Sequence, residues 1–312
     1  MTEKRTVGRR AALGLATAAG VVGATARPAG AATGGRPRGP RPVSRPRATG
    51  ELGRIRLTWE GEAYEPLVDH YAVYGSESAG FPISPQTLLT KTVFSTFAHN
   101  GMGGRSRRWH YRVVVVDAAG ERSGPCPEFS ASSTESVTVS GRPLATVGSF
   151  DHKSLELALA PAGYAQYPAR FPSGVNVTSG SGAEAGWSYI HPGPMDSWAG
   201  RRSHRFTFRF RLDAVPAGAP WLAMWLVDTH ASSPGAALFA LNGTQVREVP
   251  LERGATRGSL EGDATLPGTV LKPSYVEFAL PTSALVAGEN VLTIDKNTGS
   301  WHVYDALGIF LR

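Results

Sequence analysis

The sequence contains very little cysteine. Cys126 is the one cysteine among 312 residues, so the chain cannot form an internal disulfide. It lies between Pro125 and Pro127, and no recognisable histidine-bearing partner motif accompanies it, so we expect a loop or strand-edge thiol and no nucleophile. The fold must therefore be stabilised by its hydrophobic core.

A long, strongly apolar run is also missing. Residues 11–26 are rich in alanine and glycine, whereas a membrane-spanning helix needs roughly 20 strongly apolar residues. This weakly apolar run follows a basic head with adjacent Arg9 and Arg10, and it precedes small residues at 29–32. The arrangement is typical of a twin-arginine signal peptide. We therefore expect residues 1–32 to direct secretion through that pathway, with no membrane span in the mature chain.

An excess of positive charge is missing from the greater part of the chain. The formal net charge is +7, but ten of the 32 basic residues and one of the 25 acidic residues lie within residues 1–50. The remainder carries 22 basic and 24 acidic groups, whereas a nucleic-acid-binding domain needs clustered positive charge. We therefore expect no nucleic-acid partner. Residues 33–47 are rich in proline and arginine and are predicted to form a linker.

Recognisable catalytic and metal-binding motifs are missing too. The chain has no H-E-x-x-H, no cysteine pair, no G-x-S-x-G and no phosphate loop ending in Lys-Ser/Thr. The histidines of the second half are scattered: His191, His204, His230 and His302. No spacing pairs the carboxylates that glycoside hydrolysis would need: Asp196, Asp228, Glu277 and Asp305. These patterns argue against a zinc centre, acyl transfer and glycoside hydrolysis.

What the chain does contain is hydrophobic alternation with a period of two. GRIRLTWE, residues 53–60, places Ile55, Leu57 and Trp59 on one face. DHYAVYGS and WHYRVVVVDAAGERSGP alternate in the same way before turn residues, and no helical crossover separates these segments. The pattern predicts antiparallel strands in a β-sandwich.

The first sandwich, residues 48–135, resembles a fibronectin type III domain. The residues that carry the resemblance are Trp59, Tyr71 to Tyr74, Trp109, Tyr111, Val113, Val115 and Asp117. Trp109 stands where that family usually has its corner tyrosine.

Residues 143–312 are also predicted to be β throughout, so the whole fold class is all-β. The predicted strands lie in KSLELALA, HRFTFRFRLDAV, PWLAMWLVDTH, AALFALNGTQVREVPL, SYVEFALP, NVLTIDKN and HVYDALGIFLR. HRFTFRFRL has phenylalanine and leucine on one face and arginine and threonine on the other. Asn242-Gly243 is typical of a two-residue hairpin turn. We expect a jelly-roll β-sandwich here.

The end of the chain resembles the carbohydrate-binding-like third domain of rhamnogalacturonan lyases, polysaccharide lyase family four. The matching places are Leu285, Gly288, Asn290, Val291 to Ile294, Tyr304-Asp305 and Leu307 to Leu311. AALFALNGTQV and SYVEFALPTSAL match elements that precede these strands in the family. A fibronectin type III domain directly before this module is the order that those lyases also show.

The resemblance implies an accessory protein. In those lyases the catalytic domain precedes the fibronectin-like domain, and here that place holds only the signal and the linker. We expect a secreted, non-catalytic protein that binds pectic, rhamnogalacturonan-type polysaccharide of the plant cell wall. A polysaccharide lyase acting by β-elimination at a uronate is the alternative. A structural or interaction module is the second alternative.

The segment WSYIHPGPMDSWAGRRSH, residues 187–204, is the candidate binding platform. Sugar rings stack on tryptophan and tyrosine, and their hydroxyl groups bind planar polar side chains. The predicted carbohydrate-binding residues are Trp187, Tyr189, His191, Trp198, Arg201, Arg202, Trp301 and His302. For a lyase, Tyr189 or His191 would be the base, with Arg201 or Arg202 holding the uronate carboxylate.

No cofactor is required for binding, and a structural calcium ion is the one metal that we consider. The resemblance to carbohydrate-binding sandwiches implies a carboxylate on the first strand and another that opens the last strand. Glu156 and Asp305 stand at those places. We expect a monomer whose partner is the polysaccharide.

Overall fold

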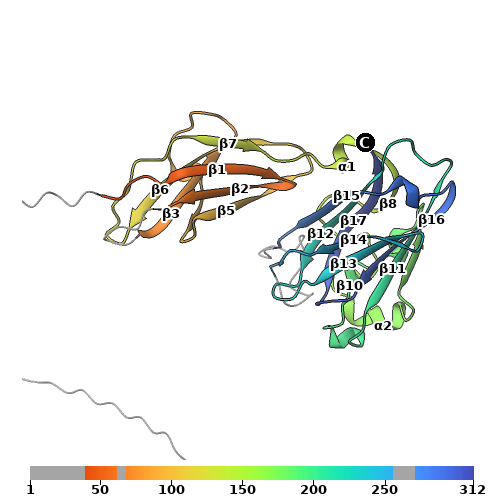
Figure 1. The fold of residues 1–312 in the computed structure, drawn as a ribbon. Helices are drawn as coiled ribbons and strands as arrows, with labels where there is room; N and C mark the ends of the chain where they lie inside the picture. The colour runs from red at the N-terminus through yellow and green to blue at the C-terminus, as the bar shows by residue number, and fades with distance from the viewer. Residues whose placement is uncertain (1–38, 62–67, 256–270) are drawn as a thin grey trace, which may run out of the picture. The chain divides into compact units, whose positions relative to one another are not determined.

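The computed structural model describes residues 39–61, 68–255 and 271–312 (Figure 1). The predicted signal peptide, residues 1–32, and most of the predicted linker lie outside the described residues. Strand β1, Ser44–Glu51, begins inside the segment that we expected to be linker, so the first sandwich starts earlier than residue 48. Within that segment Ser44 pairs with Glu60 and Arg47 with Thr58, so the pairing with the neighbouring strand extends into the end of the predicted linker.

The first sandwich consists of two antiparallel sheets. One sheet has the order β1-β2-β5, which Figure 1 shows, and the other has the order β4-β3-β6-β7. The remaining strands are β2 (Gly53–Glu60), β3 (Val68–Ser76), β4 (Leu88–Thr92), β5 (Thr96–Gly103), β6 (Arg108–Asp117) and β7 (Phe129–Ser132).

The period of two in the sequence builds the core of this sandwich. Along β2 every second residue is buried, including Ile55, Leu57 and Trp59. Trp59 meets the ring of Tyr71 edge to face, with the ring centroids 5.4 Å apart. Cys126 is buried in the same cluster, and its Sγ accepts a hydrogen bond from the backbone N–H of Val113. Burial raises the pKa of the Cys126 thiol, which fits a structural and unreactive residue.

A short helix, α1 (Val137–Ser140), connects to the second sandwich, which has two five-stranded sheets. One has the order β10-β17-β12-β15, with β8 also paired to β17; the other has the order β14-β13-β16-β11-β9. The strands are β8 (Arg142–Gly148), β9 (Val175–Thr178), β10 (Ile190–His191), β11 (His204–Leu212), β12 (Trp221–Thr229), β13 (Ala236–Leu241), β14 (Thr244–Pro250), β15 (Ser274–Ala279), β16 (Gly288–Lys296) and β17 (His302–Leu311). The helix α2 spans Tyr167–Arg170.

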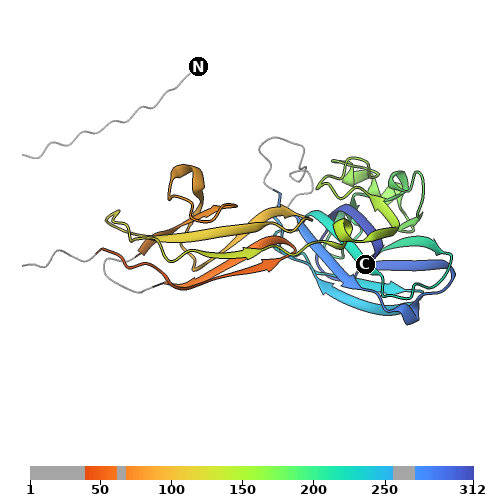
Figure 2. The ribbon, with the colours of Figure 1, turned by 90° about the horizontal axis from the view of Figure 1, so that it is seen from above.

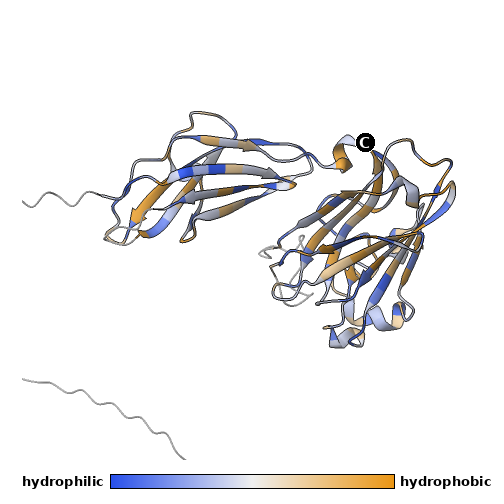
Figure 3. Ribbon diagram, viewed as in Figure 1, coloured by the Kyte–Doolittle hydropathy of each residue, from blue (hydrophilic) through white to orange (hydrophobic). Residues whose placement is uncertain are grey.

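The two sheets of the second sandwich enclose a large aromatic and aliphatic core. Phe206, Phe208 and Phe210 of β11 all point inward and are at most 1% exposed. β12 is buried over nearly its whole length, as expected for a central strand. Hydrophobic and hydrophilic residues alternate along other strands (Figure 3). Burial of each of the three phenylalanines of β11 stabilises the fold by about 1.5–3 kcal/mol relative to an exposed phenylalanine side chain.

Two sequence predictions had different outcomes. Asn242 and Gly243 join β13 to β14, and both have positive φ angles (50° and 82°), as a two-residue hairpin turn with a left-handed backbone requires. The segment KSLELALA is not a strand: it forms turns, and Leu159 has a φ of 68°. Figure 2 shows this turn-rich region, yellow-green to green, gathered at one side of the second sandwich.

Among the described residues, no helix has both the length and the apolar character that crossing a membrane requires.

Candidate functional site

The predicted aromatic platform does not lie on the surface. Five of its eight residues are at most 2% exposed, and they belong to the core of the second sandwich: Trp187, Tyr189, His191, Trp301 and His302. The expectation that these side chains stack on a sugar from an exposed loop is therefore wrong. The loop residues pack inward because their rings complete the aromatic core next to β11 and β17.

The contacts of Trp187 show how complete this packing is. Its ring meets the edges of Phe206 and Tyr304 at centroid distances of 5.1 and 5.2 Å. Such edge-to-face pairs add to the stabilisation that burial itself gives. A sugar ring could reach Trp187 only if the core opened.

His191 is held in one protonation state by its partners. Its Nε2 lies 2.9 Å from the carbonyl oxygen of His204, which can only accept, so Nε2 carries the proton. Its Nδ1 then accepts a hydrogen bond from the Tyr304 hydroxyl at 2.9 Å. Burial lowers the pKa of His191 well below its ordinary value. A fully buried imidazole with both nitrogens engaged cannot serve as the base that a lyase would need.

The other three predicted residues remain accessible. Trp198 is half-buried, with its ring edge-on to Tyr164 at 5.2 Å. Arg201 is exposed, and Arg202 donates a hydrogen bond to the backbone oxygen of Pro172. Their part in carbohydrate binding stays a prediction.

Glu156 and Asp305, the predicted calcium ligands, both bind the loop that follows β8. Glu156 Oε1 accepts a hydrogen bond from the backbone N–H of Ser149 at 2.7 Å. Asp305 Oδ1 accepts from the backbone N–H groups of Asp151 and Lys153 at 3.3 and 3.1 Å. Glu156 lies in a turn, where we had expected a strand. The two carboxylates are thus brought to one loop, although the chain separates them widely.

The environment of Asp305 fits a cation better than an unbound carboxylate. Its Oδ2 is buried and has no hydrogen-bond partner among the described residues. Burial, together with the nearby charge of Asp151, raises the pKa of Asp305 to about 7. The described part of the chain has no group of three His, Cys, Asp or Glu side chains placed to hold a metal. Backbone oxygens would therefore have to complete a calcium shell of six to eight ligands, and the calcium ion stays a prediction.

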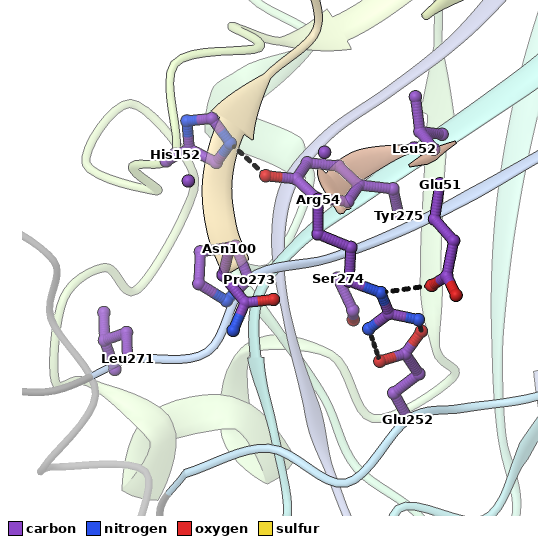
Figure 4. Close-up of a pocket in the computed structure, with 12 residues that line it drawn as sticks. Glu51, Leu52, Arg54, Asn100, His152, Glu252, Leu271, Pro273, Ser274 and Tyr275 are labelled. Atoms are coloured by element: carbon purple, nitrogen blue, oxygen red, sulfur yellow. Dashed lines mark hydrogen bonds and ion pairs between the residues drawn. The ribbon is translucent and has the colours of Figure 1, made fainter. Parts of the chain in front are cut away.

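A cavity of about 590 Å³ lies at another place, which the sequence did not indicate (Figure 4). Its volume is in the range of roughly 300–1,000 Å³ that small-molecule sites occupy. Its walls come from the end of β1, the beginning of β2, the end of β5, the loop after β8, the segment after β14 and the beginning of β15. The polar side chains that line it are Glu51, Arg54, Asn100, His152, Glu252, Ser274 and Tyr275.

The guanidinium group of Arg54 is fixed between two carboxylates (Figure 4). Its Nε donates to Glu51 at 2.5 Å, and its Nη1 and Nη2 donate to the two oxygens of Glu252 at 2.5 and 2.8 Å. Burial would lower the pKa of Arg54, but the hydrogen bonds to Glu252 and Glu51 raise it above its ordinary value. Arg54 is thus a permanent cation whose charge is already compensated.

His152 and Tyr275 form a second polar pair in the cavity wall. His152 Nε2 lies 2.7 Å from the Tyr275 hydroxyl, and the imidazole stacks on Trp225 with the ring centroids 5.1 Å apart. Burial lowers the pKa of His152, so its ring is neutral at neutral pH, and burial raises the pKa of Tyr275 to about 12. The pair therefore offers neutral hydrogen-bonding groups to a ligand.

Gly53 leaves room for the Tyr275 ring. A Cβ atom at Gly53 would lie 2.0 Å from Cε2 of Tyr275, and the φ of Gly53 is 70°. Any side chain here would displace the ring and strain the backbone. Next to Tyr275, the Oγ of Ser274 is buried and has no hydrogen-bond partner among the described residues. An orphaned hydroxyl in the wall of a cavity is a group that a ligand can satisfy.

Sequence reasoning missed these residues because no local pattern unites them. The alternation in GRIRLTWE placed Arg54 on the outer face of its strand, and nothing indicated Glu252 as its partner 198 positions away. Only the folded backbone brings the six segments together.

Comparison with known proteins assigns the second sandwich to a family. A family model described as "CBM-like: Polysaccharide lyase family 4, domain III" matches residues 144–309, just over half of the chain. No curated protein matches this chain.

Solved structures match this chain with low sequence identity and low TM-scores. The human fibronectin type III domain containing protein 3 has 14% identity to this chain over one fibronectin type III domain; the match covers 33% of this chain and 94% of that chain, with a TM-score of 0.28. A β-1,2-glucanase from Parabacteroides distasonis has 21% identity over 29% of this chain and 12% of its own, with a TM-score of 0.23. An α-L-rhamnosidase from Dictyoglumus thermophilum has 13% identity over 82% of this chain and 25% of its own, with a TM-score of 0.26. This chain therefore spans a minor part of both enzymes.

The matched residues run from β8 to β17 and so cover the second sandwich. The chain belongs to the family of carbohydrate-binding-module-like proteins defined by domain III of polysaccharide lyase family 4.

Proposed function

We propose that this protein is a secreted, non-catalytic accessory protein that binds pectic, rhamnogalacturonan-type polysaccharide of the plant cell wall. The observation that carries the proposal is the family match over residues 144–309, to a domain described as like a carbohydrate-binding module. The cavity around Arg54 and Tyr275 supplies a concave, polar and partly aromatic site that suits such a ligand. Export by the twin-arginine pathway and a monomeric state are parts of the same proposal.

Binding fits the described residues better than β-elimination does. Elimination needs an accessible base and a free cation for the developing charge. His191 and Tyr189 are buried, and Arg54, the cation that lines the cavity, is compensated by Glu51 and Glu252. The residues that we assigned to the lyase alternative therefore do not include an accessible base.

A structural or interaction role stays the second alternative. The exposed large hydrophobic residues of the described part lie in separate segments, apart from the adjacent pair Val93 and Phe94. An interaction surface would be expected to show a contiguous apolar patch of a few hundred Å² or more.

The experiment is to incubate the purified chain with immobilised pectins while following ultraviolet absorbance from unsaturated uronate ends. We expect retention on the glycan without new absorbance. Absorbance that increases with time and disappears in Arg201→Ala would show a lyase and overturn the proposal. Absence of retention on every pectin would leave the structural role as the better explanation.

A further inference from the structure

We propose that the cavity between Arg54 and Tyr275 recognises an uncharged sugar residue and discriminates against a uronate carboxylate. This inference rests on the proposed function, and it narrows the ligand from pectic polysaccharide in general to the neutral residues of such a polymer. The sequence analysis placed an arginine clamp on a uronate only in the lyase alternative, at Arg201 or Arg202, and neither is among the described residues that line this cavity.

The charges around the cavity support this selection. Arg54 is the one lysine or arginine among the described residues that line the cavity, and both of its flanking carboxylates already bind it. Arg56 binds Glu51 from outside the lining, with Nε 2.5 Å from Oε1, so the network of two arginines and two glutamates is balanced. A uronate would have to displace Glu51 or Glu252 from Arg54, and it would then face that glutamate as a like charge.

The same carboxylates are suitable acceptors for sugar hydroxyl groups. An ionised carboxylate has about four acceptor positions, and Arg54 uses only one on each oxygen of Glu252. A hydroxyl group can donate to the remaining positions, whereas a second carboxylate cannot. The orphaned Oγ of Ser274 and the exposed amide of Asn100 add further polar groups on the cavity wall.

The apolar part of the wall suits the C–H groups of a sugar ring. Tyr275, Leu52, Leu271 and Pro273 contribute carbon surface to the cavity. Gly53 fixes the place of the Tyr275 ring because no Cβ fits beside it. A ring of a neutral sugar can therefore lie against carbon while its hydroxyl groups reach the polar groups.

The test measures the affinity of the full chain for two sets of oligosaccharides by calorimetry. One set is neutral, from galactan and arabinan, and the other is oligogalacturonate. The wild-type protein should prefer the neutral set, and this binding should not change with added salt, because no ligand charge is screened. Glu252→Gln should weaken neutral binding about tenfold or more, since a charged acceptor is lost. It should strengthen oligogalacturonate binding, since Arg54 is partly released.

A pair of glycine variants provides the matched control. Gly53→Ala should weaken neutral binding by displacing the Tyr275 ring. Gly103→Ala also replaces a glycine with positive φ, but a Cβ there has nothing within 4 Å, so its binding should equal that of the wild type. Thermal unfolding of each variant confirms that it is folded.

The remaining outcomes distinguish failure of the inference from failure of the proposed function. Preference of the wild-type protein for oligogalacturonate would overturn the inference and leave the proposed function intact. Glycan binding that is the same in Glu252→Gln, Gly53→Ala and Gly103→Ala would place the ligand elsewhere and would also overturn the inference. If neither set binds but the chain is retained on immobilised pectin, the inference alone fails; if retention on every pectin is also absent, the proposed function fails with it.

Discussion

The ionisation of Asp305 should affect the stability of the protein. Its pKa in the native state is raised to about 7, mainly by burial. Since the unfolded chain ionises this group near pH 4, the contribution of Asp305 to stability is greatest below that pH and decreases as the pH rises to about 7, by up to about 1.4 kcal/mol per pH unit. Asp305→Asn imitates the protonated form and should remove this part of the pH dependence.

Denaturant unfolding of both proteins between pH 4 and pH 8, with a chelator, measures this difference. Calcium should reduce the pH dependence of the wild-type protein if a cation binds the orphaned Oδ2. Parallel stability profiles for the two proteins would contradict the raised pKa of Asp305.

Single residues in the aromatic loop show what composition cannot reveal. Tryptophan, tyrosine and histidine carry both an apolar ring and a polar group, so these residue types occur in sugar-binding surfaces and in hydrophobic cores alike. Trp187 and His191 lie in the core because β10 pairs with β17 and the rings of both residues pack against Phe206. No pattern in residues 187–204 distinguishes these two outcomes, since Pro and Gly interrupt any period.

At the scale of elements, Asn290 connects the beginning of β16 to the hairpin between β13 and β14. Its Nδ2 donates to the backbone oxygens of Val286 and Gly288, and its Oδ1 accepts from Asn242 Nδ2 and the backbone N–H of Val286. The side-chain amide of Asn290 thus forms four hydrogen bonds, and the residue is 0% exposed. Asn290→Ala should destabilise the protein by about 2–4 kcal/mol, because buried partners lose their hydrogen bonds.

Denaturant unfolding measures this loss, with Asn176→Ala as the matched control. Asn176 is exposed, and its side chain accepts a hydrogen bond from Arg209 Nε, so its loss should cost less than about 0.5 kcal/mol. Equal effects of the two variants would show that the connection through Asn290 contributes little.

Strands with a clear period and a partner on each side could be predicted from the sequence, and β2 and β11 have the predicted bounds. KSLELALA has the same alternation but is not a strand. Leu157 alone among its leucines is fully buried, Leu155 is 49% exposed, and Leu159 has a left-handed backbone. Alternation over so few residues can be satisfied by one buried side chain in a turn, so the period alone does not predict a strand there.

At the scale of the whole molecule, the fold could be predicted but the cavity could not. A β-sandwich follows from many local alternations, each visible within about eight residues. The cavity depends on which residues meet after folding, and Glu51, His152 and Glu252 lie about a hundred positions apart from one another. The family resemblance does not supply them either, because its motif residues are packing residues of the last strands.

The two sandwiches have separate hydrophobic cores, which should give two unfolding transitions. One cluster contains Leu57 and its neighbours from β2, β3 and β6, and another contains Phe208 and its neighbours from the second sandwich. Phe208→Ala should destabilise the second sandwich by about 3–5 kcal/mol, and Leu57→Ala should destabilise the first by about 2–5 kcal/mol. In differential scanning calorimetry each variant should lower the temperature of a different transition. A single transition that both variants lower equally would mean that the sandwiches unfold as one cooperative unit, and contacts such as the ion pair of Arg54 with Glu252 would then be strong enough to couple them.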